Sequence, residues 1–128
     1  MNRLLVICFL CLCSFVGISQ ETKIYPEKTV YYKENSKGEM EYINTELYVK
    51  ELLMFQYNDT YVSLNFYIGE YRYTYFFDYE YSENKGIDEE VQYWRSNVNE
   101  CLMILEDSTI TIYSFKYKFS IVYHIIDN

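Results

Sequence analysis

An alternation of aromatic residues between Tyr71 and Tyr81 limits the fold of this chain more than any other feature. In YRYTYFFDYEY (71–81) every second residue is aromatic, and Phe77 completes what is otherwise a row of tyrosines. A period of two is that of a β-strand, whose successive side chains point to opposite faces. The chain also lacks alanine, the best helix former, and is rich in Tyr, Phe, Ile, Val and Thr. We therefore expect an all-β domain.

The strand that precedes this row places its apolar residues on even positions. In YVSLNFYI (61–68) the apolar set runs from Val62 to Ile68, and the set becomes odd after Gly69-Glu70. A two-residue hairpin loop explains the switch, because glycine supplies the positive φ that such a turn needs. It sets Ile68 opposite Tyr71 and Val62 opposite Phe77, so both sets share one face.

A second loop at Asn58-Asp59 extends the hairpin upstream. It places Phe55 opposite Val62 and Leu53 opposite Leu64, in three strands near 49–57, 60–68 and 71–81. The segment TELYVKELLMF (45–55) also fits a helix, and this alternative stays open.

Further hairpins are expected towards both ends of the chain. CLMILEDSTITIYSF (101–115) predicts two strands that pair Leu105 with Ile110, and 118–126 predicts a strand with Phe119, Ile121, Tyr123 and Ile125 on one side. Residues 29–44 predict a hairpin around Asn35–Gly38. The total is seven or eight short strands, typical of a small antiparallel β-sandwich or barrel. The acidic segment 82–100 is not periodic, and Asp88 favours a short helix near 88–95.

The first residues have the layout of a secretory signal peptide. A short positive start, Met1-Asn2-Arg3, precedes an apolar stretch (4–18) that is too short to span a bilayer. We expect cleavage near Ser19-Gln20, export to the periplasm or the medium, and a single mature domain (20–128) without a transmembrane segment. A buried N-terminal strand or helix is the alternative. Lipidation is a second one, but the cysteines at 8, 11 and 13 follow bulky residues, which favours a freely released protein.

The net charge of −8 restricts the partners. An acidic chain repels nucleic acid and anionic lipid headgroups at long range. The expected partner is therefore an unidentified protein or a small molecule, and not a nucleic acid.

Two surfaces are candidates for binding. Tyr79 and Tyr81 face Thr60 and the turn residue Asn58, so they should lie at a rim where a ring can stack on a sugar or another flat apolar ligand. Tyr71, at the other end of the row, is the third ligand candidate, whereas Tyr73 to Phe77 are assigned to the core.

The reverse face of the three-strand unit is less polar than a solvent face should be. It is either covered by a second sheet or binds a partner protein. The partner candidates are Leu52, Met54, Tyr61, Tyr67 and Phe76, with Trp94 from the acidic segment.

The sequence does not favour catalysis. Cys101 and His124 are the sole cysteine and histidine of the expected mature chain, but their strand registers place them on different faces. The contiguous carboxylates Asp88-Glu89-Glu90 are a weak calcium candidate, so no metal and no cofactor are expected. The leading hypothesis is an exported, non-catalytic domain that binds a small apolar or sugar-like ligand. The alternatives are a protein-interaction module, such as an inhibitor or an envelope-complex subunit, and an enzyme that uses its carboxylates.

Overall fold

The computed structural model describes residues 20–47 and 50–125, and these form one antiparallel sheet of ten strands. The strands are β1 (Gln20–Ile24), β2 (Pro26–Glu34), β3 (Met40–Glu46), β4 (Leu52–Asn58), β5 (Tyr61–Ile68), β6 (Tyr71–Asn84), β7 (Glu90–Ser96), β8 (Cys101–Leu105), β9 (Thr109–Ser114) and β10 (Phe119–Ile125). A short 3-10 helix, η1 (Val98–Glu100), joins β7 to β8. The prediction of an all-β fold is confirmed, with more strands than expected. The predicted signal segment 1–19 lies outside the described residues, as do residues 48 and 49, where a strand was expected to begin.

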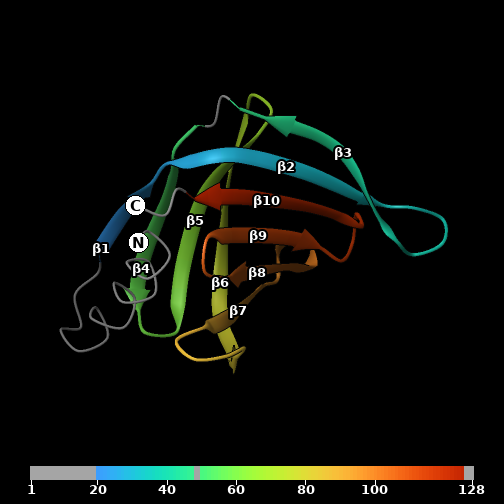
Figure 1. Ribbon diagram of the computed structural model, residues 1–128. Coiled ribbons are helices and arrows are strands. Elements are labelled where there is room, and N and C mark those ends of the chain that lie inside the picture. Colours follow the sequence, from blue (N-terminus) through green and yellow to red (C-terminus); the bar gives the residue numbers. More distant parts are fainter. Residues whose placement is uncertain (1–19, 48–49, 126–128) are drawn as a thin grey trace.

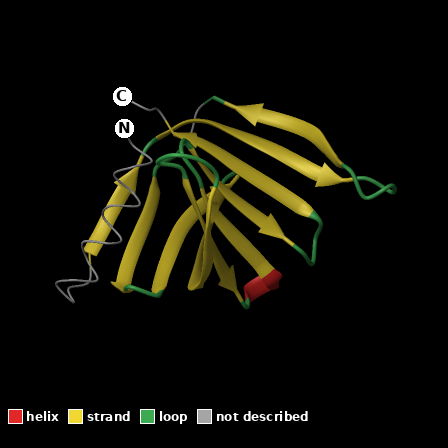
Figure 2. Cartoon of the chain, turned by 60° about the horizontal axis from the view of Figure 1, so that its bottom comes forward, coloured by secondary structure: helices red, strands yellow, loops and turns green. Residues whose placement is uncertain are grey.

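The N-terminal segment links the two ends of the sheet. The spatial order is β1-β4-β5-β6-β7-β8-β9-β10-β2-β3, so β1 pairs with β4 while β2, directly after Tyr25, pairs with β10. No pair of described strands joins β1 to β3, so the sheet is not closed. In Figure 1, β4, β5 and β6 stand upright in the picture while β2, β9 and β10 lie across it. Figure 2 shows the strands curving around a common interior.

This interior holds the hydrophobic core, to which every strand except β3 contributes a buried apolar side chain. Trp94, Phe66 and Phe77 are among the largest fully buried side chains. One core therefore forms from one coiled sheet, and not from two separate sheets that face each other.

The hairpin between β5 and β6 has the predicted register. Ile68 pairs with Tyr71 and Val62 pairs with Phe77, and Gly69 has a φ of +63° in the turn. The predicted pairs of the β8–β9 hairpin are also present, since Leu105 lies opposite Ile110. On β10 the predicted inward residues Ile121, Tyr123 and Ile125 are buried.

The predicted register of β4 is wrong by one residue. Met54, not Phe55 or Leu53, lies across from the core residue Leu64, and Gln56 lies opposite Val62. The strands turn at Asp59-Thr60, and an irregularity in the pairing lies just before this turn, between Gln56 and Asn58. A slip of one residue exchanges the two faces of a strand. The described residues of the segment 45–55, in which a helix was the alternative, contain no helix, since β3 reaches Glu46 and β4 begins at Leu52.

The predicted helix near 88–95 is also wrong, because β7 occupies this segment and pairs with β6 and β8. Asp88, the expected helix cap, has a φ of +63° in the turn before the strand. The inward positions of β7 are Gln92, Trp94 and Ser96, all of them buried. Two of these three are polar, which hides the period of two. The acidic segment 82–100 is therefore mostly part of the sheet and not a free loop.

Candidate functional site

An apolar cavity of about 340 Å³ lies inside the coiled sheet, between the β5–β6 hairpin and the strands β8, β9 and β10. Its lining residues are Phe66, Ile68, Tyr73, Tyr75, Cys101, Ile112, Ser114, Tyr117, Phe119 and Ile121. Aromatic and aliphatic side chains predominate, and no described lining residue carries an ionised group at neutral pH. A concave, mostly apolar space with a few polar groups is the usual form of a small-molecule site.

The aromatic row of β6 passes from water into this cavity and then into the core. Tyr71 is 74% exposed, Tyr73 is half-buried, Tyr75 is 8% exposed and Phe77 is fully buried. The ring of Phe66 on β5 stacks against Tyr73, with centroids 5.8 Å apart, and meets Tyr75 edge-on at 5.0 Å. Tyr75 belongs to the hydrophobic core and Tyr73 packs against it, in agreement with the sequence, and both residues also form part of the cavity wall.

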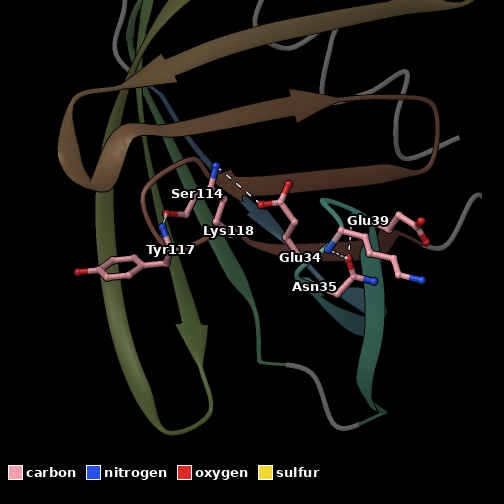
Figure 3. A network of polar contacts seen from close by, with 7 residues as sticks. Glu34, Asn35, Glu39, Ser114, Tyr117 and Lys118 are labelled. Carbon is pink, nitrogen blue, oxygen red and sulfur yellow. Dashed lines mark hydrogen bonds and ion pairs between the residues drawn. The ribbon is translucent and has the colours of Figure 1, made fainter.

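The turn between β9 and β10 borders the cavity. The Tyr117 N–H donates a hydrogen bond to Ser114 Oγ (3.1 Å), and the Lys118 N–H donates one to the Ser114 carbonyl (2.9 Å). In Figure 3, Lys118 leaves this turn towards Glu34 on β2, while Tyr117 leaves it on the other side. The Tyr117 side chain lines the cavity but is 58% exposed. Tyr117 is therefore a part of the cavity lining that is accessible to solvent.

The polar groups deepest in the wall are those of Cys101 and Ser114, which are paired across β8 and β9. Burial raises the pKa of the Cys101 thiol to about 11, while its hydrogen bond with Ser114 acts in the opposite direction. The thiol is therefore neutral at physiological pH, and a neutral thiol is a poor nucleophile. The Cys101 thiol therefore does not supply a reactive nucleophile to this wall.

A smaller void of about 30 Å³ lies beside the buried hydroxyls of Tyr31 and Tyr123. The Tyr31 hydroxyl is hydrogen-bonded to the Glu46 carboxylate and to the backbone of Gly69. Burial is the main cause that raises its pKa, the hydrogen bond and the charge of Glu46 raise it further, and the bond with Gly69 acts in the opposite direction. The Tyr123 hydroxyl donates to the Tyr67 carbonyl over 3.2 Å. This void is too small for a ligand, and the tyrosines beside it connect opposite walls of the sheet.

Tyr79 and Tyr81, which were predicted to form a ligand site together, do not share a face of the sheet. Both residues are exposed at the rim, but an irregularity in β6 between them interrupts the alternation. Tyr79 pairs with the inward-facing Trp94, whereas Tyr81 pairs with Tyr93 and stacks on its ring at 4.4 Å. Since Trp94 and Tyr93 are consecutive in a strand, the two tyrosines face opposite sides of the sheet.

Tyr71, the third predicted ligand residue, lies at the other end of β6. It is next to the turn that follows Ile68, a lining residue, but does not itself line the cavity. The three predicted ligand residues are therefore not brought together.

Of the six residues predicted for a partner surface, three are buried in the core. Leu52 and Met54 are 1% exposed and Trp94 is 2% exposed, because the β4 register and the β7 strand turn all three towards the core. Tyr61, Tyr67 and Phe76 do lie on the outer face, as their alternation with buried Val62, Leu64 and Phe66 requires.

The outer face carries a cluster of four aromatic side chains that the sequence analysis did not predict as a cluster. We call it the outer ring cluster, and it consists of Phe55, Tyr57, Tyr61 and Phe76. Tyr61 and Phe76 stack at 5.9 Å, and Tyr57 lies 5.4 Å from Tyr61. Ser63 is buried where it pairs with both Phe55 and Phe76. The sequence did not predict this cluster because it did not predict the register of β4, and that register determines that Phe55 points outwards.

Cys101 and His124 are on opposite faces of the sheet. Cys101 belongs to the interior, while His124 pairs with Lys28 and Thr109 on the outer face. Burial and the nearby Lys28 ammonium lower the pKa of His124. The two side chains therefore cannot act as a nucleophile and its base.

Residues 20–47 and 50–125 are the described part of the chain. Within these ranges the structure contains no group of three or more His, Cys, Asp or Glu side chains arranged to hold a metal ion. None of the helices in the described part of the chain has the length and hydropathy to cross a membrane.

No known protein family, curated protein or solved structure matches the chain.

Proposed function

We propose that this protein is a small non-catalytic binding protein whose ligand occupies the apolar cavity. The observation that carries the proposal is the cavity itself, about 340 Å³ in volume and lined mainly by aromatic and aliphatic side chains. Such a lining favours an apolar ligand over a sugar, because the several hydroxyls of a sugar would lose hydrogen bonds to water there. The proposal includes export, which rests on the sequence of residues 1–19.

No chemical step is part of the proposal. The one thiol in the wall is neutral, and the imidazole of His124 lies on the outer face. The aromatic side chains supply stacking surface, which binds flat or chain-like apolar molecules without a reaction.

A titration with the uncharged fluorescent dye N-phenylnaphthylamine tests the proposal. Saturable binding with enhanced fluorescence is expected for the wild-type protein. The substitution Ile68→Trp should abolish it, because the larger ring fills the cavity from the half-buried end of β5. Phe76→Trp is the matched control, since it adds the same ring on the outer face and should leave binding unchanged.

The result is interpretable only if both variants remain folded, which chemical denaturation checks. Equal binding by wild type and Ile68→Trp would place the dye elsewhere and contradict the proposal. Loss of binding in Phe76→Trp alone would locate it on the outer ring cluster.

A second candidate function, recognition of a protein partner, is favoured by that cluster. Its four rings lie on three adjacent strands, and Tyr57 and Phe76 are 39% and 41% exposed. Exposed aromatic groups of this kind are enriched at protein interfaces. Native mass spectrometry of the protein isolated from its host, compared with Tyr57→Ser, tests this candidate. A co-purifying chain that is lost in the variant would support it, and a chain retained in the variant would exclude the cluster.

A further inference from the structure

The outer ring cluster is bordered by three carboxylates. Glu21 on β1 pairs with Phe55, and Asp78 on β6 pairs with Tyr61, so each of these carboxylates lies on the same outer face as a ring of the cluster. Asp59 lies in the turn between β4 and β5, the strands that carry three of the four rings. All three acidic residues are exposed, and none of them has an ion-pair partner among the described residues.

The basic side chains of these strands lie further from the rings. Lys23 is opposite Leu53 on the other side of Glu21 from the β4–β5 turn. Arg72 pairs with Tyr67 at the far end of β5, and the Lys50 ammonium lies 4.4 Å from the centroid of the Tyr67 ring. Positive charge is therefore gathered towards one end of the outer face, and the rings at the other end have a negative border.

Arg95 on β7 shows how an arginine is held on this face. Its guanidinium carbon lies 5.1 Å from the centroid of the Phe115 ring, and its Nη2 donates to Glu80 Oε1 over 3.2 Å. The guanidinium thus combines an aromatic ring with a carboxylate. Arg95 is opposite Asp78 in the strand pairing, but its ion pair is with Glu80. The Asp78 carboxylate lies beside the outer ring cluster without such a partner among the described residues.

We propose that the outer ring cluster binds a partner protein through an arginine of that partner, whose guanidinium stacks on the exposed rings and pairs with Asp78. This inference rests on the second candidate function, recognition of a protein partner, because it names the chemistry of that partner. It does not depend on a ligand in the cavity.

An arginine fits this surface better than a lysine does. The guanidinium is planar, stacks on aromatic rings and is weakly hydrated, whereas the ammonium of lysine is a compact and strongly hydrated charge. The rings of Tyr57 and Phe76 are 39% and 41% exposed, so they offer a surface for such stacking. Arginine and tyrosine are both enriched among the residues that dominate binding at protein interfaces. The net charge of −8 also favours the approach of a cationic partner.

Peptides of defined chemistry test the inference. The probe is an acetylated and amidated hexapeptide of alternating leucine and arginine, titrated into the protein at low ionic strength and followed by NMR chemical shifts. Its counterpart contains citrulline, which has the shape of arginine without the charge. We expect the arginine peptide to bind at least about fivefold more tightly than the citrulline peptide. A lysine peptide of equal charge should also bind more weakly than the arginine peptide.

Two variants locate the binding site. Asp78→Asn should lower the affinity of the arginine peptide about threefold, because it removes the carboxylate beside the rings. Glu39→Gln is the matched control, since it removes one negative charge from the β2–β3 turn and should leave the affinity nearly unchanged. Figure 1 shows this turn on the opposite side of the molecule from the β4–β5 turn. Both substitutions are at exposed positions, and urea denaturation checks that the variants remain folded.

Several results would overturn the inference. Equal losses of affinity in Asp78→Asn and Glu39→Gln would show a general effect of charge. Equal binding of the arginine peptide and either counterpart, or no binding of the arginine peptide, would exclude recognition of arginine. A homodimer in native mass spectrometry that is lost in Tyr57→Ser would make a second copy of this chain the occupant. None of these results decides the candidate function itself, which the co-purification comparison with Tyr57→Ser measures separately.

Discussion

The hydroxyl of Tyr123 donates a hydrogen bond of 3.2 Å to the backbone carbonyl of Tyr67, and so ties β10 to the end of β5 across the interior of the sheet. Tyr31 on β2 makes a second connection of this kind to Gly69 in the β5–β6 turn. Strands that do not pair with each other are thereby held at a fixed separation. These links help to keep the cavity between them open, because the sheet itself is not closed by a strand pair.

Removal of one of these hydroxyls should weaken the fold measurably. Tyr123→Phe leaves the Tyr67 carbonyl without this donor, and we expect a loss of about 0.5–1.5 kcal/mol in the free energy of unfolding. Urea denaturation measures it. Tyr113→Phe, on the outer face of β9, should change stability by less than about 0.5 kcal/mol. An effect as large in Tyr113→Phe would mean that the cross-link is not the cause.

Two adjacent leucines test the register of β4. Leu52 is 1% exposed in the core, whereas Leu53 is half-buried on the outer face. Leu52→Ala should therefore cost about 2–5 kcal/mol of stability, since it opens a cavity in the core. Leu53→Ala removes the same atoms and should cost clearly less. The reverse order in a denaturation experiment would restore the register predicted from the sequence.

Alkaline pH should destabilise the protein, because two buried tyrosine hydroxyls must keep their protons in the folded state. Burial raises the pKa of Tyr31 and of Tyr123 above the ordinary value of 10.0. In the unfolded chain both hydroxyls lose their protons near the ordinary pKa, while in the folded protein they keep them. The free energy of unfolding should therefore fall as the pH rises above about 10. Tyr31→Phe should show a shallower fall, and an unchanged slope would mean that Tyr31 is not the group responsible.

The thiol of Cys101 should be unreactive in the native protein. With a pKa of about 11, only about one thiol in a thousand is ionised at about pH 8. Iodoacetamide should therefore modify Cys101 far more slowly in the folded protein than in denaturant, as followed by mass spectrometry. Rapid modification without denaturant would show that the cavity wall opens to water on the timescale of the reaction.

The sequence predicted best where one face of a strand is apolar and a single residue determines the turn. This holds for β5 and β6, where the positive φ of Gly69 and the two alternating sets leave a single register. It fails for β4, because Leu53 and Phe55 on the outer face are as apolar as Leu52 and Met54 on the inner one. The inner set even includes Gln56, fully buried, whose amide nitrogen donates to the Asn58 carbonyl at 3.1 Å.

The cavity itself could not have been predicted from local patterns. Tyr73 and Tyr75 were recognised as inward-facing, but the opposite wall comes from Ile112, Phe119 and Ile121, whose position depends on the order of the strands in the sheet. The outer ring cluster has the same limitation, since it depends on the register of β4. Tyr79 and Tyr81 were separated by a strand irregularity that has no signature in the alternation.

The pairing of β2 with β10 also has a consequence for how the protein is made. Val30 meets Val122 in the finished sheet, so a strand near the start of the chain has its partner near the other end of the described residues. During synthesis β2 emerges early, and until Phe119–Ile125 leave the ribosome it can pair only with β3. Pairings so distant in sequence make folding slow and leave strand edges exposed in the meantime. The growing chain is thus expected to spend most of its synthesis unable to complete the sheet, a state in which a chaperone can still engage it as an extended polypeptide.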